Sequence, residues 1–304
     1  MSKKVIDMQA SVRALLQNKA QVKRVTFEEI FQSYVMERFL YRLSKSHYSN
    51  RFILKGALLF IAWAVPDRRV TRDIDFLAYC DNQVMAIETA IRDICNVAVE
   101  MDGLVFDSKT VTGKNIKEEA DYKGVRVSLF AFLGRARVSL QIDIGFGDAV
   151  YPRIKSIDYP SILNFPNPHL KIYPHESVIS EKFEVMINLG SLNSRMKDFY
   201  DIWLMMHRFD FTSQRLSEAL KKTFEKRKTT IPEGRLLFAE EIYDDQSDCQ
   251  NLWQAFLKKG NIACAPPKLF IVAGEIEEFL KIPLGEINSG TGTNMCWTAS
   301  GPWK

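Results

Sequence analysis

Apolar residues recur at helical spacing in the first part of the chain. Between residues 27 and 43 these apolar residues fall on one helical face. Thr26 directly precedes this stretch, and Glu29 stands three residues after Thr26. Threonine and glutamate at this spacing form a capping box, in which each side chain accepts a backbone N–H at the start of a helix. We therefore expect an N-terminal helical segment over residues 1–48.

Further along, the pattern changes to short strands and turns. Phe52 to Leu54 is an apolar run typical of a buried strand, and Lys55-Gly56 follows it as a turn. Residues 57–64 predict a compact apolar helix, which ends before Pro66. The run from Asp73 to Tyr79 predicts the next strand.

Two alternating segments, residues 125–133 and 136–146, predict a β-hairpin that turns at Gly134-Arg135. In the second segment every other residue from Val138 onward is apolar, and the residues between them are polar. Because side chains alternate between the two faces of a strand, Asp143 is placed on the polar face.

Most of the remaining pattern is helical. One helix is expected near residues 85–96, whereas the proline-spaced residues 152–174 are typical of a linker or an irregular crossover. Further helices are predicted over residues 176–189, 194–206, 212–228, 248–259 and 268–281. Residues 285–304 carry no periodicity, so we expect the ordered fold to end near Leu284, with a flexible tail behind it.

Composition excludes several classes of protein. The chain has 304 residues, of which 46% are hydrophobic, and this is enough for about two domains with substantial cores. Its five cysteines include no C-x-x-C pair, which argues against a zinc site or a disulfide framework and fits a reducing cytoplasm. The longest apolar run, residues 57–65, is too short for a membrane span, so no membrane partner is expected. A net charge of +4 is equally typical of proteins with and without a nucleic-acid partner.

Three acidic residues form the main candidate site. Asp73 and Asp75 stand one residue apart in a predicted strand, so their carboxylates point to the same side. If the strand that carries Asp143 is its neighbour with a matching face, three carboxylates converge and require a cation. Such oxygen ligands suit Mg²⁺ or Mn²⁺, and two ions there would support phosphoryl or nucleotidyl transfer. Taken alone, a D-x-D sequence is more often a solvated surface alternation.

The turn ahead of these acids is a candidate phosphate contact. Gly56 allows the backbone to approach a phosphate, and the start of the following helix supplies free amide groups. Lys55 either reaches a phosphate or lies in water, and the residues leave both alternatives open.

A second candidate cluster lies in the helical half. Lys182 occupies a helix that is otherwise rich in apolar residues, and Asp198 and Asp201 share one face of the next predicted helix. Lys182 therefore contacts either a triphosphate or a carboxylate of the paired helix. The residues by themselves favour the structural salt bridge.

Five segments, in order over residues 45–205, resemble the AbiEii/AbiGii toxin family of nucleotidyltransferases. They are Leu54-Lys55-Gly56-Ala57-Leu58-Leu59, Thr71-Arg72-Asp73-Ile74-Asp75-Phe76, Gln141-Ile142-Asp143-Ile144-Gly145, Ser180-Glu181-Lys182-Phe183 and Arg195-Met196-Lys197-Asp198-Phe199-Tyr200-Asp201-Ile202-Trp203. The resemblance implies an α+β fold with a polymerase β-like nucleotidyltransferase core and a small mixed sheet over residues 49–160. It implies a helical C-terminal domain over residues 161–284 that closes the nucleotide cleft. It also implies the toxin of a bacterial toxin-antitoxin or phage-defence system, with a cognate antitoxin as a partner.

The same resemblance implies roles for individual residues. The metal ligands are Asp73, Asp75 and Asp143, and the nucleotide-binding turn is Lys55, Gly56 and Ala57. Ala57 departs from the family pattern, which has a second glycine or a serine there, and it supplies no hydroxyl. Lys182 corresponds to a nucleotide-contacting lysine and Asp198 to a helical acid, with Asp201 as the alternative for that acid.

Some members of the family transfer nucleotides to the 3′ end of tRNA, which implies attack by an RNA ribose hydroxyl on the α-phosphate of an NTP. In this reaction Asp143 binds a metal or assists deprotonation of the hydroxyl, and Lys55 and Lys182 balance the triphosphate charge. One basic stretch either meets RNA or simply complements a helix dipole. It consists of Lys221, Lys222, Lys226, Arg227 and Lys228.

Two rival classes remain open. The first is an enzyme of the same fold that modifies a protein or a small molecule, and the second is a non-catalytic protein that binds a nucleotide or a partner. Loss of Asp73 discriminates between enzyme and binding protein, because only an enzyme needs the metal site. Serine or cysteine hydrolase chemistry is disfavoured, since the chain has no G-x-S-x-G motif and its four histidines show no triad spacing. Walker-type phosphate binding is disfavoured because the chain has no P-loop motif.

Overall fold

The computed structural model describes residues 7–118, 122–190, 193–233 and 237–304, so residues 1–6 of the expected N-terminal segment lie outside it. The chain forms two compact units. Unit 1 comprises Met1–Ala64, Thr71–Gly147 and Lys155–Ile172. Unit 2 comprises Val65–Val70, Asp148–Ile154 and Tyr173–Lys304.

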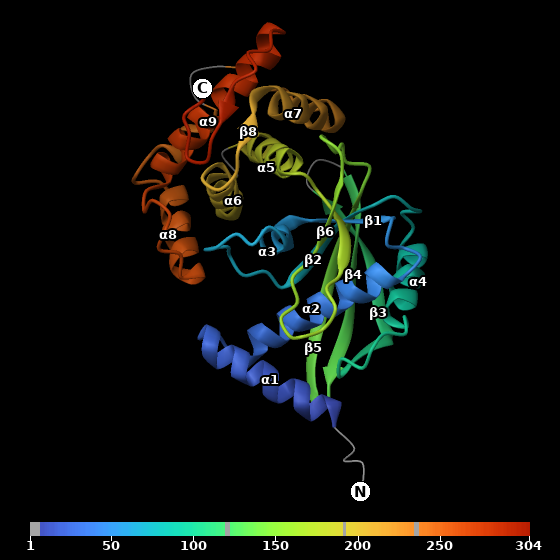
Figure 1. Ribbon diagram of the computed structural model, residues 1–304. Helices are drawn as coiled ribbons and strands as arrows, with labels where there is room; N and C mark the ends of the chain where they lie inside the picture. Colours follow the sequence, from blue (N-terminus) through green and yellow to red (C-terminus); the bar gives the residue numbers. More distant parts are fainter. Residues whose placement is uncertain (1–6, 119–121, 191–192, 234–236) are drawn as a thin grey trace, which may run out of the picture. The chain divides into compact units, whose positions relative to one another are not determined.

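Unit 1 contains a mixed β-sheet with the strand order β3-β4-β5-β2-β1-β7-β6 (Figure 1). The strands are β1 (Phe52–Lys55), β2 (Asp73–Ala78), β3 (Leu104–Glu118), β4 (Tyr122–Leu133), β5 (Ala136–Phe146), β6 (Lys155–Asp158) and β7 (His169–Ile172). The pairs β2·β5 and β1·β7 are parallel, and the other neighbours are antiparallel. The predicted hairpin is therefore confirmed as β4 and β5, and the expected mixed sheet is present.

Helices α2 (Phe27–Lys45) and α4 (Val84–Cys95) of unit 1 pack on one face of this sheet, and α1 (Met8–Lys23) packs against α2. The predicted capping box starts α2, since Thr26 Oγ1 accepts from Glu29 N at 3.2 Å and Glu29 Oε2 accepts from Thr26 N at 2.9 Å. Figure 1 shows α4 alongside β3, where a Cβ added to Gly113 would meet Val84 of α4.

The two faces of the sheet differ in polarity, as the alternation predicts. On β4, the odd-numbered residues from Val125 to Leu133 are buried, whereas the even-numbered residues from Arg126 to Phe132 are only half-buried. Phe106 of β3 lies on the same side as the odd-numbered residues and packs against Phe39 of α2, with ring centroids 5.9 Å apart. The helices thus cover the apolar face, and we call the opposite side the outer face.

Two predicted segments of unit 1, one connecting segment and one helix, differ from the structure. The proline-spaced segment expected to be a linker or an irregular crossover contains β6 and β7, which are too short to show an alternation in the sequence. Residues 57–64 are not one helix. They form a 3₁₀ turn, Gly56–Leu58, followed by α3, Leu59–Ala62. Among the described residues, no helix is long and apolar enough to cross a membrane.

Unit 2 is mainly helical. Its helices are α5 (His175–Leu189), α6 (Met196–Met206), α7 (Ser213–Arg227), α8 (Asp248–Gly260) and α9 (Leu269–Ser289), with a 3₁₀ turn at Glu240–Ile242. A short antiparallel pair joins β8 (Phe211–Thr212) to β9 (Cys296–Trp297). The helices predicted for this half are all present, within a few residues at their ends except for α9.

The structure also differs from the expected end of the fold near Leu284. Helix α9 continues to Ser289, and Trp297 beyond it is buried. The Trp297 ring lies 5.0 Å from that of Phe279, and its Nε1 donates to Met206 O at 2.7 Å. A single buried aromatic residue can anchor a segment without producing any periodicity, and for this reason the sequence pattern gave no sign of it.

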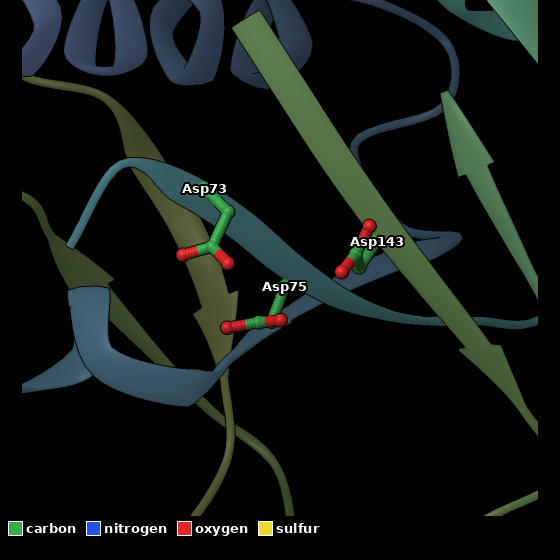
Figure 2. Close-up of side chains that lie close together, drawn as sticks. All are labelled: Asp73, Asp75 and Asp143. Carbon is green, nitrogen blue, oxygen red and sulfur yellow. The ribbon is translucent and has the colours of Figure 1, made fainter. Parts of the chain in front are cut away.

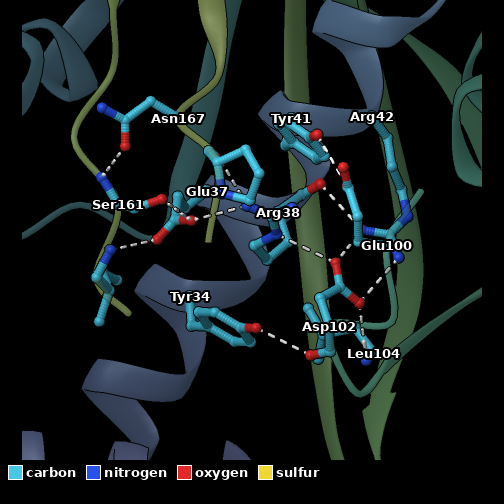
Figure 3. A network of polar contacts seen from close by, with 12 residues as sticks. Tyr34, Glu37, Arg38, Tyr41, Arg42, Glu100, Asp102, Leu104, Ser161 and Asn167 are labelled. Atoms are coloured by element: carbon cyan, nitrogen blue, oxygen red, sulfur yellow. Dashed lines mark hydrogen bonds and ion pairs between the residues drawn. The ribbon is translucent and has the colours of Figure 1, made fainter. Parts of the chain in front are cut away.

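A buried polar network ties α2 to two loops of unit 1 (Figure 3). Asp102 accepts from Arg38 Nε at 3.1 Å and from Arg42 Nη1 at 2.7 Å. Glu37 accepts from the backbone N of Ile162 at 2.7 Å. Burial alone would raise the pKa of Asp102, but hydrogen bonds and the charge of Arg42 hold it below its usual value. Asp102 therefore pairs with two arginines that are almost fully buried, and Glu37 is a second acidic partner of Arg38.

We expect Asp102→Asn to lower the free energy of unfolding by about 3 kcal/mol, because it leaves buried cations without their main acid. The loss is limited because Arg38 keeps Glu37 as a partner, at 3.4 Å. Urea unfolding measures it. The control is Asp93→Asn, whose carboxylate accepts from Tyr48 on the surface, and this variant should stay within about 1 kcal/mol of wild type. Equal losses in the two variants would contradict the prediction.

Candidate active site

The parallel pairing of β2 with β5 brings the three predicted acids together. Asp75 lies directly opposite Asp143 in this register, and Asp73 lies opposite Gln141. Each acid offers a carboxylate oxygen, and these oxygens lie within 4.8 Å of one another. Figure 2 shows the three carboxylates gathered at the same part of the sheet. A cluster of oxygen donors of this size fits Mg²⁺ or Mn²⁺.

The acids belong to a row of charged residues that crosses five neighbouring strands. The register pairs Lys114 of β3 with Arg126 of β4, Arg126 with Asp143 of β5, Asp143 with Asp75 of β2, and Asp75 with Lys55 of β1. Directly paired residues point to the same side of a sheet. Cations therefore flank the acids on both sides and offset part of their mutual repulsion.

Arg126 is a site residue that the sequence reasoning missed. Its Nε and Nη2 atoms each donate to an Asp143 carboxylate oxygen at 2.7 Å. The hydrogen bonds to Asp143, together with the charges of Asp73 and Asp75, raise the pKa of Arg126. The signal in the sequence was an arginine at a polar position of a predicted strand, but only the register shows which acid it meets.

Two further residues hold the strands that carry the acids. The Thr71 hydroxyl donates to Oδ1 of Asp73. The side-chain amide of Gln32, from α2, donates to Arg72 O at 3.0 Å and to Ser139 O at 3.4 Å. Gln32 therefore bridges the start of β2 to β5, and it supports the alignment that brings the acids together.

Gly56 lies against one of the acids. Its φ of +70° is a conformation that favours glycine, and a Cβ added there would come within 2.6 Å of Cγ of Asp75. The turn is thus shaped to leave room for the Asp75 carboxylate. Ala57, next to it, is buried and lies in the 3₁₀ turn rather than at the start of a long helix, which weakens the helix-dipole argument for a phosphate at this place.

We expect Gly56→Ala to lower activity by about tenfold or more, because the new methyl group displaces a carboxylate of the candidate metal site. Gly147→Ala is a matched control, since Gly147 also has a positive φ, +77°, but an added Cβ there meets nothing within 4 Å. Both variants carry the cost of an unfavourable φ, of about 1–2 kcal/mol. Steady-state rates and thermal unfolding of the two variants test this, and equal loss of activity in both would contradict the proposed contact.

The second predicted cluster is present within unit 2. Lys182 Nζ of α5 lies 2.6 Å from Oδ1 of Asp198 and 2.7 Å from Oδ2 of Asp201, both on α6. Arg195 pairs with Asp198 at 2.6 Å, and Arg69 pairs with Asp201 at 3.0 Å. Both acids are about 1% exposed and Lys182 is 13% exposed, so the cluster is an almost buried ion network.

The network controls the ionisation of its members. Burial would raise the pKa of Asp198, but the charges of Lys182 and Arg195 outweigh it and lower the pKa to about 2. For Lys182, burial would lower the pKa, but Asp198 and Asp201 raise it above its usual value. Burial would also raise the pKa of Asp201, but the charges of Arg69 and Lys182 outweigh it and lower the pKa. Lys182, Asp198 and Asp201 therefore stay charged near neutral pH.

The low pKa of Asp198 predicts acid destabilisation. A carboxylate whose folded pKa lies below its unfolded value of about 4 stabilises the fold above that value, and this stabilisation is lost as the pH falls toward 2. Its size is on the order of 2 kcal/mol, and about half of it is lost by pH 3. Urea unfolding at pH 6 and pH 3 checks this. We expect Asp198→Asn to lose less stability than wild type over this interval, and an identical loss would contradict the prediction.

The basic stretch of α7 is only partly available to a ligand. Arg227 is 8% exposed and donates to Glu184 at 2.8 Å and to Asp148 at 3.1 Å, all within unit 2. Lys222 pairs with Glu218 one turn away, at 2.8 Å. For Arg227 the RNA alternative is therefore not supported, because its guanidinium pairs with buried acids.

Comparison with known proteins gives one family match and two structural matches. A family model described as "Nucleotidyl transferase AbiEii toxin, Type IV TA system" matches residues 38–266. A structure described as a putative nucleotidyltransferase from H. pylori is 11% identical, with a TM-score of 0.50, and the match covers 88% of this chain and 99% of that one. JHP933 from Helicobacter pylori is 13% identical, with a TM-score of 0.50 and coverage of 87% and 98%. At these identities the likeness shows the fold alone. No curated protein matches the chain.

Proposed function

The chain belongs to the AbiEii family of nucleotidyl transferase toxins of type IV toxin-antitoxin systems, and we propose that it transfers an NMP from an NTP to the 3′ end of an RNA, with tRNA as the preferred acceptor. The observation that carries this proposal is the adjacency of Asp73, Asp75 and Asp143 on neighbouring parallel strands. Three clustered carboxylates on the outer face have a clear use in binding metal ions for phosphoryl chemistry.

In this mechanism a ribose hydroxyl oxygen bonds to the α-phosphorus of the NTP, and the bond from that phosphorus to the pyrophosphate oxygen breaks. Asp73, Asp75 and Asp143 would hold Mg²⁺ or Mn²⁺, which neutralises charge on the attacking and leaving oxygens when bound. Asp143 alternatively accepts the hydroxyl proton. Arg126 donates two hydrogen bonds to the Asp143 carboxylate and so fixes its position opposite Asp75.

We assign different roles to Lys55 of unit 1 and Lys182 of unit 2. Lys55, in the row of charges next to Asp75, balances negative charge on the triphosphate. Lys182 contacts the nucleotide, as the family resemblance implies, and Asp198 and Asp201 position its ammonium group. We place the catalytic core in unit 1, whose sheet includes β7, and the helical domain in unit 2, in which α9 continues to Ser289, with a cytoplasmic location and a cognate antitoxin as the partner.

The test is incubation of the protein with total RNA, Mg²⁺ and each NTP in turn, labelled at the α-phosphate. We expect label in RNA with at least one nucleotide, and none with Asp73→Asn or Asp75→Asn. Label in a protein or a small molecule instead would replace RNA as the acceptor. Absence of both transfer and metal-dependent NTP binding would favour a non-catalytic binding protein and overturn the proposal.

A further inference from the structure

The outer face of β3, β4 and β5 carries a polar and aromatic surface beside the acids. On β4, the residues of this face are Arg126, Ser128, Phe130 and Phe132, all half-buried. Arg137 and Ser139 of β5 and Lys114 of β3 are exposed on the same side. Strands covered on both faces do not carry such residues at every second position. This part of the sheet is therefore built to meet polar surroundings or a polar ligand.

The surface is continuous with the candidate metal site. The register places Ser128 opposite Gln141, and Gln141 opposite Asp73. Phe130 is the next residue of β4 on this face, opposite Ser139, and Phe132 follows it, opposite Arg137. At about 3.4 Å per residue, Phe130 lies roughly 14 Å along β4 from Arg126. A chain whose end reacts at the acids can thus extend over these side chains.

The side chains on this surface suit a single-stranded nucleic acid. The Arg137 guanidinium carbon lies 4.6 Å from the centroid of the Phe130 ring, which joins a cation to an aromatic platform. Lys114 adds a second cation in the row that contains Arg126. Apart from the metal-ligand acids, the acid on this face among the described side chains is Asp107, which accepts from Lys109 N at 3.1 Å. Half-buried aromatic rings next to cations are the features that bind bases and phosphates of unpaired strands.

We infer that this outer face binds the single-stranded RNA segment directly before the reacting 3′ end, with a base on Phe130 and phosphates on Arg137 and Lys114. The inference rests on the proposed function, and it specifies where the acceptor lies. A duplex would not offer the faces of its bases to the ring.

The test measures binding of a 5′-labelled eight-nucleotide single-stranded RNA and of total tRNA by fluorescence polarisation. We expect Phe130→Leu to weaken binding about tenfold or more, because leucine keeps apolar bulk but removes the stacking ring. Phe130→Tyr keeps the ring and should bind like wild type. Arg137→Gln should weaken binding severalfold. It should also reduce the slope of the logarithm of the binding constant against the logarithm of the salt concentration by about one, because one phosphate contact is lost. Lys258→Gln, which removes an exposed lysine of α8, is the control for net charge.

Metal-dependent NTP binding and thermal unfolding are measured in parallel, and both should be unchanged in these variants. Wild-type affinity of Phe130→Leu for both RNAs would overturn this surface and leave RNA as the proposed acceptor. If wild type binds neither RNA but labels a protein or a small molecule, both the surface and the proposed acceptor are wrong. Equal weakening by Lys258→Gln would reduce the effect to net charge and also contradict the inference.

Discussion

Asp75→Asn is expected to lower the rate of nucleotide transfer at least about a thousandfold, which corresponds to about 4 kcal/mol of transition-state stabilisation. Asp75 lies between Asp73 in its own strand and Asp143 in the next, and its carboxylate fills the space left by Gly56. Asparagine keeps the shape of the side chain but removes its charge. We therefore expect the variant to lose transfer activity through loss of this charge and not through unfolding.

Two measurements separate this effect from unfolding. The variant should retain the thermal unfolding temperature of wild type or exceed it, because removal of one acid relieves repulsion in the cluster. Metal binding, followed by titration with Mn²⁺, should weaken in parallel with activity. Asp158→Asn changes an acid that is 69% exposed in the same unit and should leave both unchanged. Substantial transfer by Asp75→Asn would mean that these acids do not hold the metal.

Asp198→Asn is expected to lower the free energy of unfolding by about 4 kcal/mol, since it breaks a buried ion network without removing its cations. In wild type, Asp198 and Asp201 neutralise most of the charge of Lys182, Arg195 and Arg69. After the substitution one acid faces three cations, of which Lys182 is 13% and Arg69 16% exposed, whereas Arg195 is 32% exposed. Urea unfolding at pH 7 measures the difference.

The matched control is Asp245→Asn, which removes an exposed ion pair with Lys268 in the same unit and should cost less than about 1 kcal/mol. The double variant Lys182→Met, Asp198→Asn should be less destabilised than the sum of the two single variants, because removal of both charges keeps the net charge of the cluster as in wild type. Additive losses would show that Lys182 and Asp198 do not interact in the folded protein.

Local patterns in the sequence predicted most of the elements of this fold. The capping box at Thr26, the hairpin of β4 and β5, and the strand that carries Asp73 follow from side-chain spacing and turn residues alone. The failures have physical causes. Strands β6 and β7 are too short to show an alternation, and β9 is anchored by the burial of Trp297 rather than by any periodicity.

The candidate site divides in the same way. Alternation placed Asp73, Asp75 and Asp143 on polar faces, and helical spacing placed Asp198 with Asp201. Side-chain spacing did not identify Arg126 or Gln32, whose partners are distant in the sequence, or Thr71, whose hydroxyl bonds to Asp73. The sequence pattern also grouped Arg227 with the lysines of a basic stretch, although the Arg227 side chain pairs with buried acids.

The sequence by itself determined which side chains share a face of a strand or a helix, because that follows from the local geometry of the backbone. Only the tertiary structure decided which faces meet. The parallel register of β2 with β5 joins segments about 70 residues apart, and a shift of one residue would turn Asp143 away from Asp75. That register depends on packing of the whole sheet against its helices, and it converts three separate acids into one candidate metal site flanked by Arg126 and Lys55.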